Sequence, residues 1–237
     1  VRVKKKLADK EKEELRITRF IRDIPIGNIQ GGASIPNMRQ LVLKKCIQLG
    51  FRCPCIRCSE IKDRQFRSNM VFTKTKIYEA SGGLEYFISK QTIIEGERYI
   101  IGFVRLRCSK DAGMGFLPVL KDSALIRELH VYGNLNSTKE DINNSKSNSQ
   151  HKGYGKDLMK TAEKIASENG FKKICVISGV GVRNYYRKLG YELEGGYMTK
   201  KLYNSYNYKL SIKIIIIGLI IRFIIRYLNN YFYNIYK

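Results

Sequence analysis

The chain has 237 residues, of which 43% are hydrophobic, and this content excludes a wholly disordered protein. Its formal net charge of +23 predicts attraction to nucleic-acid phosphates or anionic lipid, with genome composition as the alternative cause of the lysine-rich sequence. Lysine and arginine outnumber aspartate and glutamate by 17 to 7 in residues 1–67, by 22 to 14 in residues 68–202 and by 5 to 0 in residues 203–237. The basic excess is therefore densest at the two ends of the chain.

The N-terminal segment, residues 1–67, is typical of the basic end of a larger protein. Its opening stretch, VRVKKKLADKEKEELRITRF, is charged and lacks the apolar centre of a secretory signal. A chain that begins at Val1 instead of methionine is expected to be a fragment or a processed chain. A helix is predicted over residues 37–49, and we expect little hydrophobic core in this segment alone.

Three of the six cysteines stand together in CPCIRC, as Cys53, Cys55 and Cys58. In a reducing compartment, a C-x-C-x2-C cluster is better explained by a metal than by disulfides. Three thiolates suit a tetrahedral zinc site that needs one further donor, for which Cys46 is the candidate. The sequence therefore predicts a structural zinc site in this segment.

Residues 68–202 change to short β-rich runs, which are followed by alternating helices and strands. The predicted strands are TKIYEA at 75–80, EYFIS at 85–89, YIIGFVRLRC at 99–108, ALIRELHVY at 124–132, KKICVIS at 172–178, and the segments 191–194 and 197–202. Helices are predicted over residues 153–168 and 183–189, and a polar surface loop over residues 134–149. Cys108 and Cys175 lie in apolar strand runs and are predicted core residues. This order of elements predicts an α/β or α+β layered domain.

The stretch QHKGYGKDL opens the helix predicted over residues 153–168 and contains Gly153 and Gly155. A glycine turn that follows a strand and leads into a helix points backbone N–H groups outward, which suits a pyrophosphate. No third glycine completes G-x-G-x-x-G and no Lys-Ser/Thr follows, so dinucleotide and P-loop sites are excluded. The alternative is that Gly153 and Gly155 only allow the helix to begin and pack, and that they bind no anion.

The segment 203–237 carries a long apolar run, LSIKIIIIGLIIRFIIRYL at 210–228. Its length is close to the roughly 20 residues that span a bilayer. Lys213, Arg222 and Arg226 oppose insertion, since each arginine near a helix centre costs about 2.5–3.5 kcal/mol against about 0.3–0.6 kcal/mol gained per Ile, Leu or Phe. Tyrosine-rich flanks favour a membrane anchor. A buried or amphipathic helix is the alternative.

The loop QHKGYG and the later stretch RNYYRKLGYE at 183–192 together resemble the two halves of the acetyl-CoA site in the GCN5-related N-acetyltransferase fold. The resemblance implies a mixed twisted sheet flanked by helices, to which the basic N-terminal extension and the hydrophobic C-terminal helix are added. It implies that Gln150, Gly153 and Gly155 hold the pyrophosphate and that Tyr186 lies near the thioester sulfur. The other cofactor-binding residues that it implies are His151, Lys152 and Tyr154 in the loop and Glu128, Leu129, His130 and Val131 on a strand.

Seven motifs resemble, in order, those of the catalytic subunit of Elongator over residues 17–202. They are RFIRDIPIGNI, MRQLVLKKC, CPCIRC, GFVRLR, IRELHVYG, QHKGYG and VISGVGVRNYYRKLGYELEGGYM. This family joins a radical S-adenosylmethionine domain, with an iron–sulfur cluster, to an acetyltransferase domain that modifies the wobble uridine of tRNA. The resemblance implies acetyl-CoA and zinc as cofactors, and tRNA, other Elongator subunits and a second copy in a homodimer as partners. The cluster's cysteine motif lies upstream of this chain, so S-adenosylmethionine and the iron–sulfur cluster are expected only in the missing part.

Three domains are expected on this basis. Residues 1–67 are the end of the radical domain with a zinc-binding linker, residues 68–202 are the acetyl-CoA-binding domain and residues 203–237 are the tail. The tail resembles that of the membrane-tailed forms in apicomplexan parasites. We therefore expect a cytoplasmic protein anchored to an organelle membrane through its tail, with the nucleus as the less favoured location.

Three residues are the candidate catalytic groups. Tyr186, whose side-chain type has an ordinary pKa of about 10, is suited to protonate a departing CoA thiolate. One of Tyr185 and Tyr186 is expected to pack in the core. Glu128 is a candidate general base or, alternatively, a paired surface charge, and His130 is expected to be a core residue.

The expected activity is acetyl-CoA-dependent modification of the tRNA wobble uridine by an acyltransferase. A protein lysine N-acetyltransferase is the first alternative, since the Elongator family was first described as a histone acetyltransferase. A non-catalytic, membrane-tethered RNA-binding module is the second alternative.

Overall fold

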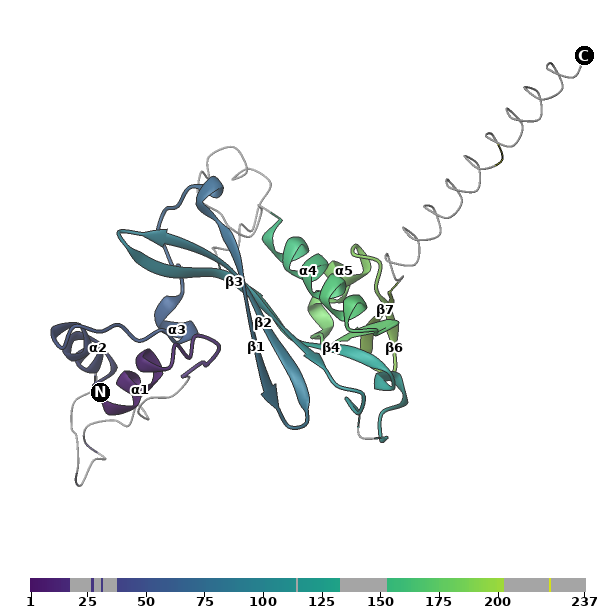
Figure 1. Ribbon diagram of the computed structural model, residues 1–237, viewed down its shortest axis with the longest axis horizontal. Helices are drawn as coiled ribbons and strands as arrows, with labels where there is room; N and C mark the ends of the chain where they lie inside the picture. The colour runs from purple at the N-terminus through teal and green to yellow at the C-terminus, as the bar shows by residue number, and fades with distance from the viewer. Residues whose placement is uncertain are drawn as a thin grey trace, which may run out of the picture. The chain divides into compact units, whose positions relative to one another are not determined.

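The structure is a computed structural model, which describes residues 1–17, 27, 31, 38–113, 115–132, 153–202 and 222. The described helices are α1 (Arg2–Asp9), α2 (Met38–Gln48), α3 (Ile56–Ser59), α4 (Tyr154–Glu168) and α5 (Arg183–Arg187). The described strands are β1 (Phe72–Ala80), β2 (Gly83–Ile94), β3 (Glu97–Cys108), β4 (Ser123–Val131), β5 (Lys173–Val176), β6 (Glu192–Glu194) and β7 (Tyr197–Lys201), as Figure 1 shows.

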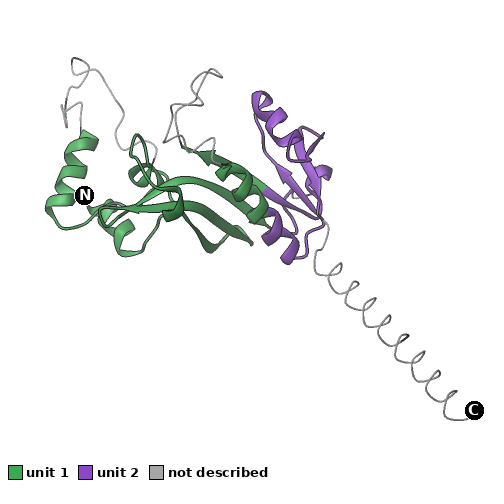
Figure 2. Cartoon of the chain, turned by 90° about the horizontal axis from the view of Figure 1, so that it is seen from above, with its two compact units in different colours: residues 1–108, 126–162 green, residues 109–125, 163–237 purple. Residues whose placement is uncertain are grey.

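The strands form a seven-stranded sheet in the order β1-β2-β3-β4-β5-β7-β6. The chain divides into two compact units, which Figure 2 colours green and purple. Unit 1 comprises residues 1–108 and 126–162, and unit 2 comprises residues 109–125 and 163–237. Each unit is described by itself below.

Two long antiparallel hairpins, β1–β2 and β2–β3, form the frame of unit 1 (Figure 1). Each closes through a two-residue turn, Ser81-Gly82 in the first and Glu95-Gly96 in the second. All four turn residues have positive φ, between 47° and 76°. This is the mirror-image turn whose twist matches that of paired strands, and glycine at the second position makes it inexpensive.

The hydrophobic core of unit 1 forms around Phe87 of β2 and Phe103 of β3, whose ring centroids lie 5.3 Å apart. Ile56 and Ile61, from the segment that carries the three clustered cysteines, are buried in the same core. The Ile61 N–H also donates a hydrogen bond to the Ile100 carbonyl of β3 at 3.0 Å. The cysteine segment is therefore fixed to the sheet and has no core separate from it.

Residues 11–16, which we call the N-terminal strap, are held by ion pairs to side chains of β1 and β3. Glu13 and Glu14 are both buried. Lys74 and Arg98 each lie 3.0 Å from Glu13, and Lys76 lies 3.1 Å from Glu14. Buried carboxylates need such partners, because the loss of hydration is otherwise uncompensated.

In unit 2, β7 pairs antiparallel with both β5 and β6. Tyr191 is buried there, and its hydroxyl donates a hydrogen bond to Glu163 Oε1 at 2.9 Å. Lys200 of β7 lies 2.9 Å from the other oxygen of Glu163. This network fixes the segment between α5 and β6, so the residues of α5 rest on a rigid base.

All seven predicted strands and the helices predicted over residues 37–49, 153–168 and 183–189 are confirmed, with ends shifted by a few residues. The predicted hydrophobic C-terminal helix lies outside the described residues. The helices α1 and α3 were not predicted: α3 has only four residues, and α1 carries three consecutive lysines. The division into compact units does not test the domain limits expected at 67/68 and 202/203, which stay predictions. The loop 134–149 lies outside the described residues, and so does the tail except for residue 222. In the part of the chain that is described, we find no helix long and apolar enough to cross a membrane.

Candidate functional site

The start of α4 has the backbone geometry of an anion site. Gly153 has a φ of 75°. Its carbonyl accepts a hydrogen bond from the Asp157 N–H at 3.0 Å, and this bond closes the first turn of the helix. The N–H groups of the residues between them therefore have no partner within the helix, and the helix dipole adds positive character. A Cβ at Gly153 would meet nothing within 4 Å, so the backbone angle and not space requires glycine here.

Two residues of the loop differ from expectation. Gly155 lies inside α4 and is not among the residues with positive φ, so it does not supply the turn. The Tyr154 side chain is only 7% exposed and packs against Phe66, with ring centroids 6.5 Å apart. Tyr154 can therefore serve a ligand only through its backbone. The other three predicted residues of the loop, Gln150, His151 and Lys152, lie outside the described residues.

Glu128 lies on β4 in unit 1, and both of its carboxylate oxygens face arginines. Arg105 Nε donates to Oε2 at 3.1 Å, and Arg16 of the N-terminal strap donates to Oε1 at 3.4 Å. Accepting a proton would weaken both ion pairs, so this geometry favours the paired charge over the general base. The arrangement also links the strap to β4, the strand on which the resemblance implies cofactor-binding residues.

The other predicted residues of β4 are Leu129, His130 and Val131, and all three are partly buried. The His130 ring stacks on Phe103 at 6.0 Å and meets Tyr132 edge-on at 4.5 Å. Burial, followed by the nearby Arg16, lowers the pKa of His130. His130 is therefore an uncharged aromatic packing residue at neutral pH, in agreement with its predicted role.

The tyrosine pair lies on α5 in unit 2. Tyr186 is 5% exposed, whereas Tyr185 is 38% exposed, so Tyr186 is the member that packs in the core. Its ring meets Tyr185 at 5.2 Å and Tyr191 at 6.0 Å, both edge-on. Burial, and then the neighbouring Tyr185, raises the pKa of Tyr186 to about 12. The Tyr186 phenol is therefore protonated at physiological pH, as an ordinary tyrosine also is, and the raised pKa makes it a weaker acid than an exposed tyrosine.

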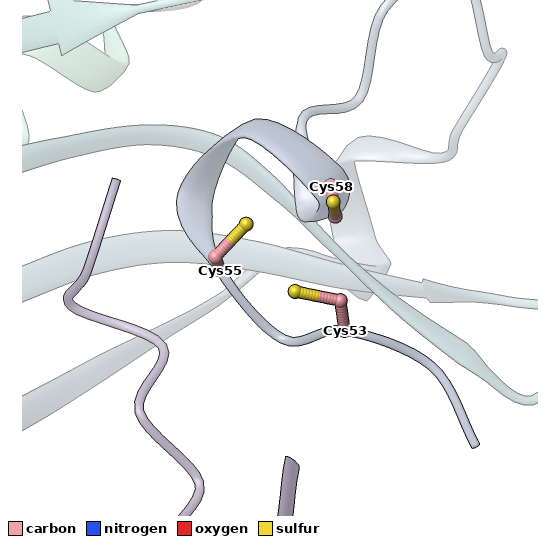
Figure 3. A group of neighbouring side chains, drawn as sticks. All are labelled: Cys53, Cys55 and Cys58. Atoms are coloured by element: carbon pink, nitrogen blue, oxygen red, sulfur yellow. The ribbon is translucent and has the colours of Figure 1, made fainter. Parts of the chain in front are cut away.

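The sulfur atoms of Cys53, Cys55 and Cys58 form the second candidate site, in unit 1. All three lie within 4.8 Å of one another, and Figure 3 shows them gathered around the first turn of α3. A tetrahedral zinc ion with Zn–S bonds of about 2.3 Å holds its sulfur ligands about 3.8 Å apart, so the cluster fits zinc. Cys46 is buried and its sulfur is not part of this group, so its role as the fourth ligand stays a prediction.

Two cationic side chains near this cysteine cluster were not predicted. Lys4 Nζ lies 3.4 Å from Cys58 Sγ, and Arg39 Nη2 lies 3.8 Å from the same sulfur. Hydrogen bonds from Cys53 and Cys55, followed by the Lys4 ammonium, lower the pKa of Cys58. The sequence carried no signal for these contacts, because Lys4 and Arg39 are 54 and 19 residues away from Cys58.

Comparison with known proteins relates both regions to one family. Residues 145–191, which include the Gly153 turn and α5, match the acetyltransferase (GNAT) family model. A "tRNA uridine(34) acetyltransferase" of Methanocaldococcus infernus is 41% identical over 196 residues, covering 79% of this chain and 35% of that protein. "Elongator complex protein 3" of Danio rerio is 40% identical over 195 residues, covering 79% and 34%.

A solved structure agrees with the sequence matches. The archaeal Methanocaldococcus infernus Elp3 with an N-terminal deletion superposes with a TM-score of 0.66 at 39% identity, covering 80% of this chain and 45% of that one. This chain spans about a third of the length of the curated relatives it matches. The chain is therefore a homologue of the GNAT-containing region of Elongator complex protein 3 and the tRNA uridine(34) acetyltransferases.

Proposed function

We propose that this chain is the acetyl-CoA-binding part of an acyltransferase of the Elongator type, which modifies the wobble uridine of tRNA. The observation that carries the proposal is the roughly 40% identity to relatives named "tRNA uridine(34) acetyltransferase" and "Elongator complex protein 3", over a region that contains the Gly153 turn and Tyr186. The positive φ of Gly153 before a fifteen-residue helix supports the pyrophosphate half. The match of residues 145–191, which include Tyr186, to the acetyltransferase (GNAT) family model supports the thioester half.

In the proposed mechanism, the N–H groups at the start of α4 bind the pyrophosphate of acetyl-CoA. The backbone of β4 would hold the pantetheine arm. When a nucleophile, either water or the acceptor on tRNA, bonds to the acetyl carbon and the C–S bond breaks, the Tyr186 hydroxyl would donate its proton to the departing sulfur, so that CoA leaves as a neutral thiol. The nucleophile keeps the acetyl group, and the proton that it loses restores the phenol. We assign no step of radical chemistry to the residues of this chain.

Release of CoA thiol from acetyl-CoA, with and without tRNA, tests this function on the 237-residue chain. Thiol release that rises several-fold when tRNA is added is the expected result. A lysine-containing peptide serves as the competing acceptor. Acetylation of the peptide in the absence of tRNA, with no effect of tRNA on thiol release, would support the protein lysine acetyltransferase instead.

The outer face of α1 is the proposed tRNA contact. Arg2, Lys5 and Lys6 are exposed there, whereas Lys4 is wholly buried. Neutralised phosphates release counterions, so each lost contact should reduce the slope of log affinity against log salt by about 0.7–0.9. We expect Arg2, Lys5 and Lys6 replaced together by glutamine to reduce that slope for tRNA, as measured by filter binding. An unchanged slope would show that these three residues of α1 do not contact tRNA phosphates.

We further propose a zinc ion at Cys53, Cys55 and Cys58. The sulfur cluster supports this proposal, and zinc would supply structural cross-linking there rather than a catalytic water.

We also propose that residues 203–237 attach the protein to a membrane. The apolar run at 210–228 supports this proposal. Truncation after Leu202 should move the protein out of the carbonate-washed membrane fraction. Recovery of the untruncated chain in the wash would contradict the membrane proposal.

A further inference from the structure

Lys4 is a wholly buried lysine to which the proposed acetyl-CoA site assigns no role. It lies on the first turns of α1, its side chain is 0% exposed, and its ammonium donates to Cys58 Sγ at 3.4 Å. Lysine is almost never fully buried without a charged partner. An ammonium taken out of water costs several kcal/mol unless an opposite charge compensates it. Cys58 is one partner of the buried ammonium, so the charge of the cysteine cluster acts directly on Lys4.

A metal–thiolate group has the charge that Lys4 requires. Three cysteine thiolates around one Zn²⁺ carry a net charge of −1, because the metal cancels two of the three negative charges. Cys53 and Cys55, at 1% and 0% exposure, are as buried as Lys4 itself, and Cys58, whose sulfur accepts from Lys4, is partly buried. Arg39 approaches the same Cys58 sulfur at 3.8 Å, from α2.

We propose that Lys4 is the outer-sphere counter-ion of the metal–thiolate site, so that loading of zinc fixes α1 against the cysteine cluster. This rests on the zinc ion proposed above and not on acetyl-CoA binding. A hydrogen bond from Lys4 to a ligating sulfur withdraws charge from the thiolate and stabilises the metal-bound form. By linkage, the metal must stabilise the docked position of α1 by the same free energy.

The path of the chain between α1 and the cysteines is consistent with this coupling. The Leu15 carbonyl accepts the N–H of Ile56, the first residue of α3, at 2.9 Å. The N-terminal strap is therefore hydrogen-bonded to the metal-binding segment itself, and Lys4 adds a second contact to that segment from α1. The exposed residues Arg2, Lys5 and Lys6 lie on the same helix as Lys4. The metal would thus determine how α1 presents its basic face to an anionic partner.

Zinc affinity, measured by competition with a chromophoric chelator, tests the proposal on three forms of the chain. Lys4→Met keeps the length of the side chain and removes its charge, and Lys5→Met makes the same change at the next, exposed position. We expect Lys4→Met to weaken zinc binding about 10- to 100-fold, the usual effect of losing an outer-shell partner, and Lys5→Met to bind as the wild type does. Equal affinity of the two variants would overturn the role of Lys4. A wild-type chain that binds no zinc would overturn the site as well, and would leave the acetyl-CoA proposal untouched.

Hydrogen exchange of the wild-type chain gives a second test that needs no substitution. Removal of zinc should speed exchange in residues 2–9, whereas α4, at residues 154–168, serves as the internal reference and should not change. Unchanged exchange in residues 2–9 would contradict the coupling. Equal loss of protection in α1 and α4 would also contradict it, because the metal would then support the whole fold and not the docking of α1.

Discussion

Replacement of Gly153 by glutamate should abolish measurable acetyl-CoA binding. The substituted carboxylate would stand at the N-terminus of α4, where it satisfies the free N–H groups and repels the incoming pyrophosphate. A like charge about 4 Å away costs about 4 kcal/mol at an effective dielectric of 20, which corresponds to about a thousandfold weaker binding. Calorimetric titration of the variant with acetyl-CoA measures the effect.

Gly170→Glu is the matched control. Gly170 follows the other end of α4, has a φ of 85° and, like Gly153, has nothing within 4 Å of an added Cβ. Both substitutions therefore carry the same cost of about 1–2 kcal/mol for a side chain in the left-handed region, but only the first puts charge at the anion site. We expect similar losses in melting temperature and a loss of binding only in Gly153→Glu. Wild-type affinity in that variant would show that the turn merely opens a helix.

Tyr186→Phe should retain acetyl-CoA binding and slow thioester cleavage by about 10²- to 10⁴-fold, the usual contribution of a general acid. Removing the hydroxyl leaves the buried ring contacts with Tyr185 and Tyr191 in place, so the fold should be kept. Because the phenol has a pKa of about 12, Tyr186 should remain a proton donor until the pH approaches that value. A stopped-flow assay of thiol release measures the rate, and calorimetry measures the binding.

Tyr185→Phe is the control for Tyr186→Phe. It removes a hydroxyl from the exposed member of the pair, on the same turn of α5. We expect a much smaller loss of rate from this variant. Equal losses from both variants would assign the effect to the local packing of α5, and an undiminished rate in Tyr186→Phe would remove Tyr186 from the chemistry.

The pattern of secondary structure in residues 68–202 was predictable because it depends on local sequence. Strands such as Tyr99–Cys108 are apolar runs between turn residues, and the helix after Gly153 has a regular apolar stripe. The same local signal marked Gly153 as a turn, since only glycine adopts a φ of 75° without strain. It could not separate Gly153 from Gly155, because both glycines fit the motif and only the start of the helix distinguishes them.

The side-chain contacts that sequence reasoning missed join distant residues. Arg16 and Glu128 are 112 residues apart, and Lys4 and Cys58 are 54 apart, so no periodicity connects them. Burial of Lys4 also contradicts the rule that lysine lies at the surface, and such violations occur where a specific partner compensates the charge.

The central claim is that the turn before α4 binds the pyrophosphate of CoA. Hydrogen exchange of the 237-residue chain, with and without saturating CoA, tests this most directly. The claim predicts slower exchange at residues 153–157, with a dependence on CoA concentration that reaches saturation. Unchanged exchange at residues 153–157 would contradict the claim.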